Sequence, residues 1–157
     1  GKASVTLLYD SDIDEFTPCS IFEKVKGKPN VAVIGFTTDG DVFGGFYTVA
    51  VTRLGKFVLD PNIFAFAFEA HGRCETPQRF MVKSNWKERA YVGVWNYLGS
   101  GFVQFWGGAG GFYLGCERSN SSCSNMSLTF EGLENSTLTG TKNPNFHNTH
   151  LIAVHLS

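Results

Sequence analysis

The chain has 157 residues, enough for one domain that buries a core of its own. Hydrophobic residues make up 43% and charged residues 17%, a balance typical of a globular protein rather than a disordered one. Lys and Arg number 13 against 14 acidic residues, without a basic stripe, so nucleic acid binding by phosphate neutralisation is not supported. No apolar run approaches the roughly 20 residues needed to span a bilayer, so we expect no membrane insertion. Because the chain starts at Gly1 without a Met or a signal-like segment, we expect it to be cut from a longer protein.

Four cysteines and three Asn-x-Ser/Thr sequons allow two interpretations of the cell compartment. The cysteines are Cys19, Cys74, Cys116 and Cys123, and the sequons start at Asn120, Asn125 and Asn135. One interpretation is a secreted, disulfide-linked protein. The other is an intracellular protein, because disulfide scaffolds are usually smaller and the sequons fall in a Ser/Asn-rich stretch where chance matches are expected. We favour the second, and expect four reduced thiols and an intracellular, cytoplasmic location.

The first part of the chain predicts one strand and one helix. Val5–Tyr9 alternates as a strand does. Thr17 can cap a helix that has Pro18 at its first position, and the apolar residues that follow recur at helical spacing. Gly27 is expected to end this helix. Cys19 falls in the first helical turn, where the helix dipole favours a thiolate.

The stretch from residue 31 to residue 51 predicts a β-hairpin. Two apolar runs, Val31–Phe36 and Val42–Val51, flank Asp39-Gly40, which predicts a two-residue turn with positive φ at both turn residues. Gly44-Gly45 interrupts the second strand, so we expect a β-bulge or a very close neighbour there. That neighbour is either another part of the protein or a ligand.

The remaining segments predict further short strands. Along Ile63–Glu69 three Phe share one face and two Ala the other, which indicates close packing on the Ala side. Further strands are expected at Tyr91–Trp95, Phe102–Trp106, Phe112–Cys116, Leu128–Phe130 and Phe146–Leu156. The run Gly107–Gly111 lacks the Gly-Lys-Ser/Thr ending of a phosphate-binding loop, and we interpret it as a tight connection between strands.

Three of the four histidines lie in the last segment. Because residues two apart share a face of a strand, His147 and His155 are expected to point one way and His150 the other. Three ligands converging on one metal are therefore not expected, and we predict no metal and no cofactor. No serine lies in a Gly-x-Ser-x-Gly turn and no Cys–His–acid trio is visible, so we assign no catalytic residue. A trio assembled in space stays open.

Several short motifs occur in one order along the chain. They are Leu7-Leu8-Tyr9, Asp39-Gly40-x-x-Phe43-Gly44-Gly45, Phe64-Ala65-Phe66, Gly107-Gly108-x-Gly110-Gly111 and Thr129-Phe130. In this order and spacing they resemble the TLDc domain, the module of the oxidation-resistance proteins, over nearly the whole chain. The chain departs from the family pattern at Pro61-Asn62, where Gly-Glu is usual, and at Leu151–Val154, where Leu-Glu-Val-Trp is usual. Because the acidic residues most often given functional weight in the family are missing, no catalytic role is carried over.

The resemblance implies a mainly β (α+β) fold: a two-layer antiparallel β-sandwich with one or two short flanking helices, formed by residues 1–157 as a single domain. It also implies a non-catalytic intracellular protein-interaction domain, linked to oxidative-stress resistance and to regulation of the vacuolar proton pump. A subunit of that pump is then the expected protein partner.

We expect the contact surface on the two longest polar loops, Glu117–Asn125 and Glu131–Asn145, since sandwiches of this kind display function on their connections. The candidate contact residues are Glu117, Arg118, Asn120, Glu131, Glu134 and Asn135. Two other functions stay open. One is a glycan-binding sandwich that stacks sugars on Trp86, Trp95, Tyr97 or Trp106. The other is a thiol-dependent peroxide-consuming or hydrolytic enzyme that uses Cys19 or Cys74 with a histidine.

Overall fold

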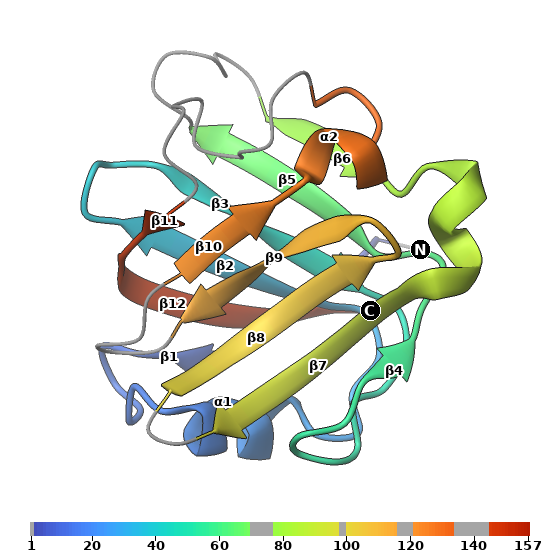
Figure 1. Cartoon of the computed structure of the whole chain (residues 1–157). Helices are drawn as coiled ribbons and strands as arrows, with labels where there is room; N and C mark the ends of the chain where they lie inside the picture. The colour runs from blue at the N-terminus through green and yellow to red at the C-terminus, as the bar shows by residue number, and fades with distance from the viewer. Residues whose placement is uncertain (1, 70–76, 98–99, 116–120, 134–144) are drawn as a thin grey trace.

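Two antiparallel β-sheets pack face to face in the computed structural model (Figure 1). The structure describes residues 2–69, 77–97, 100–115, 121–133 and 145–157. Sheet A contains, from edge to edge, β1 (Val5–Asp10), β12 (Asn148–Leu156), β2 (Val31–Thr37), β3 (Val42–Tyr47), β5 (Phe64–Glu69) and β6 (Gln78–Met81). Sheet B contains β11 (Asn145–Phe146), β10 (Ser121–Ser124), β9 (Gly110–Gly115), β8 (Ser100–Gly107), β7 (Ala90–Tyr97) and β4 (Val58–Leu59). The predicted two-layer antiparallel sandwich is confirmed.

The core lies between the sheets, because the inward-facing positions on both are apolar. Phe43 and Tyr47 of sheet A and Phe105 and Phe112 of sheet B are among the largest fully buried side chains. The Phe105 and Phe112 rings stack with centroids 5.0 Å apart, and the Tyr47 ring lies 6.2 Å from Phe105. Burial of each such side chain stabilises the fold by roughly 1.5–3 kcal/mol.

Helix α1 (Pro18–Val25) contacts strands of both sheets at one end of the sandwich (Figure 1). Thr17 Oγ1 accepts a hydrogen bond from the Ser20 backbone N–H at 3.2 Å, as its predicted role as cap requires. Gly27 has a φ of +73° just after the helix. The apolar stripe of the helix, which includes Ile21, is buried. The predicted helix, cap and stop are confirmed.

The β2–β3 hairpin forms as predicted, but its turn differs. Gly40 has a φ of +87°, whereas Asp39 is not among the described residues with positive φ. The Gly40 N–H donates to the Thr37 carbonyl at 3.1 Å, and the Thr37 N–H donates to the Asp41 carbonyl at 2.9 Å. The loop therefore has three residues, a turn followed by one glycine in the left-handed region, and the predicted two-residue turn is wrong. This alternative needs positive φ at one residue only, and Gly supplies it without strain.

Gly44-Gly45 marks a close approach of other protein atoms. A Cβ on Gly45 would lie 2.6 Å from Cζ of Phe105, whose ring comes from sheet B. A Cβ on Gly44 would lie 1.9 Å from the Val33 carbonyl oxygen. The irregularity in the pairing of β3 with β5 lies earlier, between Val42 and Phe43. The protein itself, and not a ligand, thus lies against the Gly45 face of this pair.

A buried carboxylate fixes the connection between β3 and β5. Asp60 is completely buried, and it accepts hydrogen bonds from the Thr48 N–H at 2.5 Å, the Thr48 hydroxyl at 2.8 Å and the Asn62 N–H at 3.0 Å. Hydrogen bonds to an ionised acceptor are stronger than those between neutral groups. Asp60 therefore holds the segment that leads from β4 to β5.

The glycine run forms the tight connection that the sequence predicts. β8 and β9 pair up to Gly107 and Gly110, so Gly108 and Ala109 are the two turn residues. The predicted strand at Leu128–Phe130 is wrong: Met126–Thr129 forms the one-turn helix α2. In this turn Thr129 Oγ1 lies 2.9 Å from the Gly107 carbonyl oxygen and 3.0 Å from the Gly110 carbonyl oxygen, so its single proton is shared between the two acceptors. Ser84–Arg89 forms the 3₁₀ helix η1.

Candidate functional site

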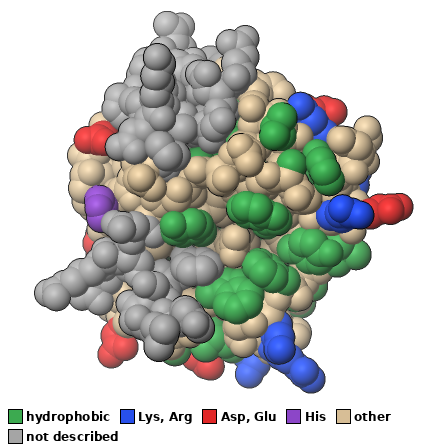
Figure 2. All heavy atoms as spheres, in the orientation of Figure 1, with side chains coloured by type: hydrophobic (Ala, Val, Ile, Leu, Met, Phe, Trp, Pro, Cys, Tyr) green, Lys and Arg blue, Asp and Glu red, His purple; other side chains and the backbone are tan. Residues whose placement is uncertain are grey.

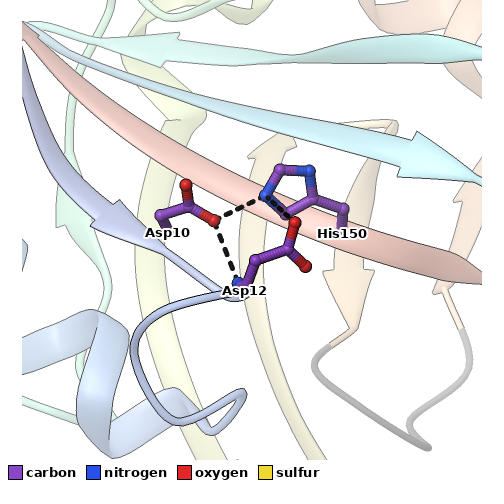
Figure 3. Close-up of side chains that lie close together, drawn as sticks. All are labelled: Asp10, Asp12 and His150. Carbon is purple, nitrogen blue, oxygen red and sulfur yellow. Dashed lines mark hydrogen bonds and ion pairs between the residues drawn. The ribbon is translucent and has the colours of Figure 1, made fainter.

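A cluster of polar side chains lies at the end of β1, on the outer face of sheet A (Figure 3). β1 pairs with β12, and Asp10 lies opposite Ile152. His150 extends from β12 toward the carboxylates, with its Nε2 atom 2.6 Å from Asp10 Oδ1 and 3.6 Å from Asp12 Oδ2. Its ring stacks on Phe36 of β2, with centroids 5.0 Å apart. Carboxylates and an aromatic ring together hold the imidazole in place.

Hydrogen bonds account for the electrostatics of this cluster. Asp10 Oδ1 also accepts a hydrogen bond from the Asp12 backbone N–H at 2.9 Å. This bond, and after it the bond to His150, holds the pKa of Asp10 below its ordinary value of 3.8. The Asp12 side chain is 71% exposed, so water screens its attraction to the imidazole. The cluster therefore connects the two paired strands at their solvent side.

Imidazole and carboxylate groups, as in these three side chains, are also ligands for divalent cations such as Zn²⁺. Their ligand atoms lie within 4.8 Å of one another. However, Nε2 of His150 is already hydrogen-bonded to Asp10, and Asp10 also bonds to the backbone of the turn. We therefore interpret the cluster as a hydrogen-bonded link between β1 and β12. The sequence did not predict this cluster. Its signal is the pair of acidic residues in Asp10-Ser11-Asp12, which lies at the end of β1, the strand that pairs with β12 and its His150.

The predicted facing is confirmed for His150 and His155: His150 lies opposite the outward Phe36 and His155 opposite the buried Val31, so the two residues lie on opposite faces of β12. β12 carries an irregularity between Asn148 and His150. Phe146 and Asn148 are buried before this point and Leu151 and Ala153 after it, so the alternation shifts by one residue. His147 is exposed and lies in the connection between β11 and β12, so the predicted common strand face with His155 does not form. A β-bulge adds one residue to a strand, and the sequence gives no sign of it here.

A second feature is an apolar groove of about 350 Å³ on the outer face of sheet A. The predicted alternation of β5 is confirmed: Ala65 and Ala67 are completely buried in the core, whereas Phe64, Phe66 and Phe68 point outward. These Phe side chains form one wall of the groove, and apolar residues of β12 and β1 form the other. Outer faces of sandwich sheets are normally polar, so this face is unusual.

A third feature is an apolar surface at the β4 edge of sheet B, which we call the aromatic patch: Phe57, Leu59, Tyr91 and Trp95. Phe57 and Leu59 are 44% and 49% exposed. The Phe57 ring lies 4.9 Å from Trp95 and 6.0 Å from Tyr91, and Leu59 pairs with Tyr91 across the strands. Figure 2 shows hydrophobic side chains gathered on this side of the molecule, with Lys and Arg side chains around them.

The aromatic residues proposed as sugar platforms are in part engaged by the protein. The ring of Trp86 packs against Gly108, where a Cβ would lie 2.0 Å from Cε3, and its indole N–H donates to the Leu128 carbonyl at 3.1 Å. Trp95 has Phe57 against it. Trp106 is half-buried, and the side chain of Tyr97 lies outside the described part. Two of the four candidates are therefore packed against other groups.

The residues of the family-like motifs lie mostly at packing and turn positions. Phe43 and Phe130 are completely buried. A Cβ on Gly110 would lie 2.1 Å from the Ser124 carbonyl oxygen, and one on Gly111 would lie 2.1 Å from the Phe105 carbonyl oxygen. Close backbone packing thus requires these glycines, whatever their family.

Most of the predicted loop residues lie outside the described residues. These are Glu117, Arg118, Asn120, Glu134 and Asn135, while Glu131 is described and exposed. Cys74 and Cys116 also lie outside. Cys123 is buried, and Cys19 is exposed and accepts a hydrogen bond from Asn96 Nδ2 at 3.3 Å.

The comparisons with known proteins give no match: no family model matches the chain, and no curated protein matches it either. None of the helices in the described part of the chain has the length and apolar composition of a membrane span. The functional argument therefore depends on the surfaces described above.

Proposed function

We propose that this chain is a non-catalytic protein-interaction domain of the TLDc kind, and that it binds its partner through the aromatic patch of sheet B. The observation that carries the proposal is the exposure of Phe57 and Leu59 beside Tyr91 and Trp95. Contiguous exposed apolar side chains are uncommon on monomeric proteins and mark interaction sites. Tyr and Trp are also the residues that contribute most to binding in protein interfaces.

The charges beside the patch indicate the chemistry of the partner. Arg53 and Lys56 are exposed in the turn immediately before Phe57. Cations at the rim of an apolar surface attract a partner that has acidic residues around an apolar contact. By the resemblance to the TLDc domain, the first candidate is a subunit of the vacuolar proton pump with such an acidic surface.

The environment of Cys19 supports a non-catalytic role. A thiol becomes a nucleophile when a neighbouring base or cation favours the thiolate. The neighbour of Cys19 is the side-chain amide of Asn96, which is neutral and takes no proton. The amide donates a hydrogen bond to the sulfur, and an amide is neither the general base nor the cation that activates a thiol.

The experiment measures binding of the purified domain to purified pump subunits from the same organism. Leu59→Ser and Phe57→Ser should each weaken binding about tenfold or more, because buried apolar contacts at the centre of an interface dominate affinity. Leu128→Ser is the matched control: Leu128 is 55% exposed, similar to Leu59 at 49%, but lies on α2 away from the patch. The Leu128→Ser variant should bind the pump subunits with the same affinity as the unmodified domain.

Two results would reject parts of this proposal. If both patch variants bind normally while replacing residues 131–145 with a short Gly/Ser turn abolishes binding, the loop and not the patch is the contact surface. If the purified domain consumes peroxide, esters or glycosides and loses this activity on Cys19→Ser, the domain is an enzyme.

A further inference from the structure

The apolar groove of sheet A is built from aligned cross-strand residues. In one row across the sheet, Val154 lies opposite Ala32, Ala32 opposite Phe46, and Phe46 opposite Phe64. Directly opposite side chains on one face of a sheet are in contact. Ala32 is the smallest of the four, so a depression opens above it, between the Phe46 side and the Val154 side. Phe46 and Phe64 stack with centroids 4.9 Å apart, which gives that wall a continuous aromatic surface.

Nothing in the core requires this surface. The inward residues of the same strands, such as Val33 and Ala65, already bury the other side of sheet A. The outward residues Val5 and Phe68 remain 65% and 41% exposed. An apolar concavity of this size, about 350 Å³, is within the range of small-molecule sites.

Among the described residues that line the groove, Arg79 of β6 is the one with a charged side chain. Its guanidinium carbon lies 5.2 Å from the centroid of Phe64, so the cation rests on the aromatic wall. Among the described residues it has no carboxylate partner within ion-pair distance. A guanidinium presents planar, paired N–H donors that match a carboxylate. The groove thus combines an apolar surface with one exposed cation that rests on its aromatic wall.

We propose that the groove binds a fatty acid, with the acyl chain along the depression at Ala32 and the carboxylate on Arg79. From β6 to β12 there are four strand spacings, about 19 Å, which gives room for an extended acyl chain. The arginine selects the charge of the ligand's head group, because it attracts an anionic head group and repels a cationic one. This site lies on the opposite sheet from the aromatic patch, so it does not depend on the proposed protein contact.

The test uses decanoate as probe, below its micelle concentration, and decyltrimethylammonium as a ligand of equal chain length and opposite charge. Calorimetry gives the affinities, and NMR shifts of backbone amides locate the site. We expect saturable binding of decanoate with shifts in β2, β3 and β5, and much weaker binding of the cation.

Two variants and a matched control then separate the head group from the tail. Arg79→Gln should lower the affinity for decanoate about tenfold, because it removes a charge-assisted hydrogen bond. It should not lower the affinity for decyltrimethylammonium. Ala32→Leu projects into the groove and not into the core, so it should abolish binding while the thermal melt stays normal. Arg89→Gln, an exposed arginine beside sheet B, should bind like the unmodified domain.

Several results would overturn the assignment. These are equal affinity for both head groups, full binding by Arg79→Gln, or shifts that map elsewhere. A concentration-dependent dimer that broadens the groove amides without ligand would assign the face to a second copy of the chain. Groove shifts on adding the purified protein partner would assign it to that protein instead.

Discussion

The contact between Gly45 and Phe105 predicts the effect of a single added methyl group. In Gly45→Ala the new Cβ would lie 2.6–2.7 Å from three atoms of the Phe105 ring, about 0.8 Å short of the 3.4 Å at which ordinary contact begins. Movement of the ring is restricted, because it is completely buried and stacks on Phe112 with centroids 5.0 Å apart. Overpacking of this kind costs about 1–3 kcal/mol.

The net effect is smaller than this cost. Replacing glycine by alanine also reduces the entropy of the unfolded chain, which stabilises by about 0.4–1 kcal/mol. We therefore expect Gly45→Ala to lower the free energy of unfolding by about 1–2 kcal/mol. For a chain of this size each kcal/mol lowers the melting temperature by roughly 2–4 °C. Urea titration and calorimetry measure both quantities.

A double-mutant cycle with Phe105→Leu tests the cause. Leucine lacks the ring atoms that meet the new methyl group, so Gly45→Ala should cost much less in the Phe105→Leu background than alone. A coupling of about 1 kcal/mol is expected for residues in direct contact. If the two effects simply add, or if Gly45→Ala is as stable as the unmodified protein, the inferred packing between the sheets is refuted.

Three further predictions concern stability. Gly40→Val should destabilise the fold by roughly 1 kcal/mol through backbone strain at φ +87°, although a Cβ would have open space around it. Gly40→Asn should cost less because Asn tolerates this region of φ, and chemical denaturation of both variants compares the two costs. Asp60→Ala should destabilise by about 3 kcal/mol because the Thr48 and Asn62 donors lose a buried carboxylate, and a melt unchanged by it would contradict this role. Because the pKa of Asp10 is lowered in the fold, its contribution is present above pH 3.8 and lost as the pH falls through the lower folded pKa. Asp10→Asn should therefore be less stable than the unmodified protein at pH 5 and equally stable at the lowest pH. If urea melts from pH 2 to 5 give the same difference in free energy of unfolding between the two proteins at every pH, this linkage is excluded.

Local rules predicted those parts of the fold that depend on neighbouring residues. Thr17 and Pro18 specify a helix start through their own hydrogen bonding and φ, so distant residues are not needed. The alternation of Phe and Ala along β5 separates two faces, and the structure places the Ala face in the core. The predicted length of the hairpin turn was wrong, because a single glycine is compatible with either a two-residue or a three-residue loop.

Contacts between distant residues were beyond such rules. The bond between Asp10 and His150 joins positions 140 apart, and it exists because β1 and β12 pair. Pairing of the chain ends is a property of topology that no local pattern expresses. The irregularity of β12 between Asn148 and His150 was also beyond local rules, because it arises in the pairing with β2. The groove was also missed, since the Phe face of β5 becomes a site only beside Ala32 and Val154.

The distribution of charge connects the two proposed binding surfaces. The net charge of the chain is −1, so neither sign dominates. Four carboxylates lie within residues 10–15, around the turn after β1. Both exposed apolar surfaces carry cations instead: Arg79 rests on the groove of sheet A, and Arg53 and Lys56 precede the patch of sheet B. Apolar contact supplies most of the binding free energy but does not discriminate between ligands, whereas a fixed charge beside it does. Both surfaces should therefore select anionic partners, and raising the salt concentration should weaken both interactions without changing which side chains make the apolar contacts.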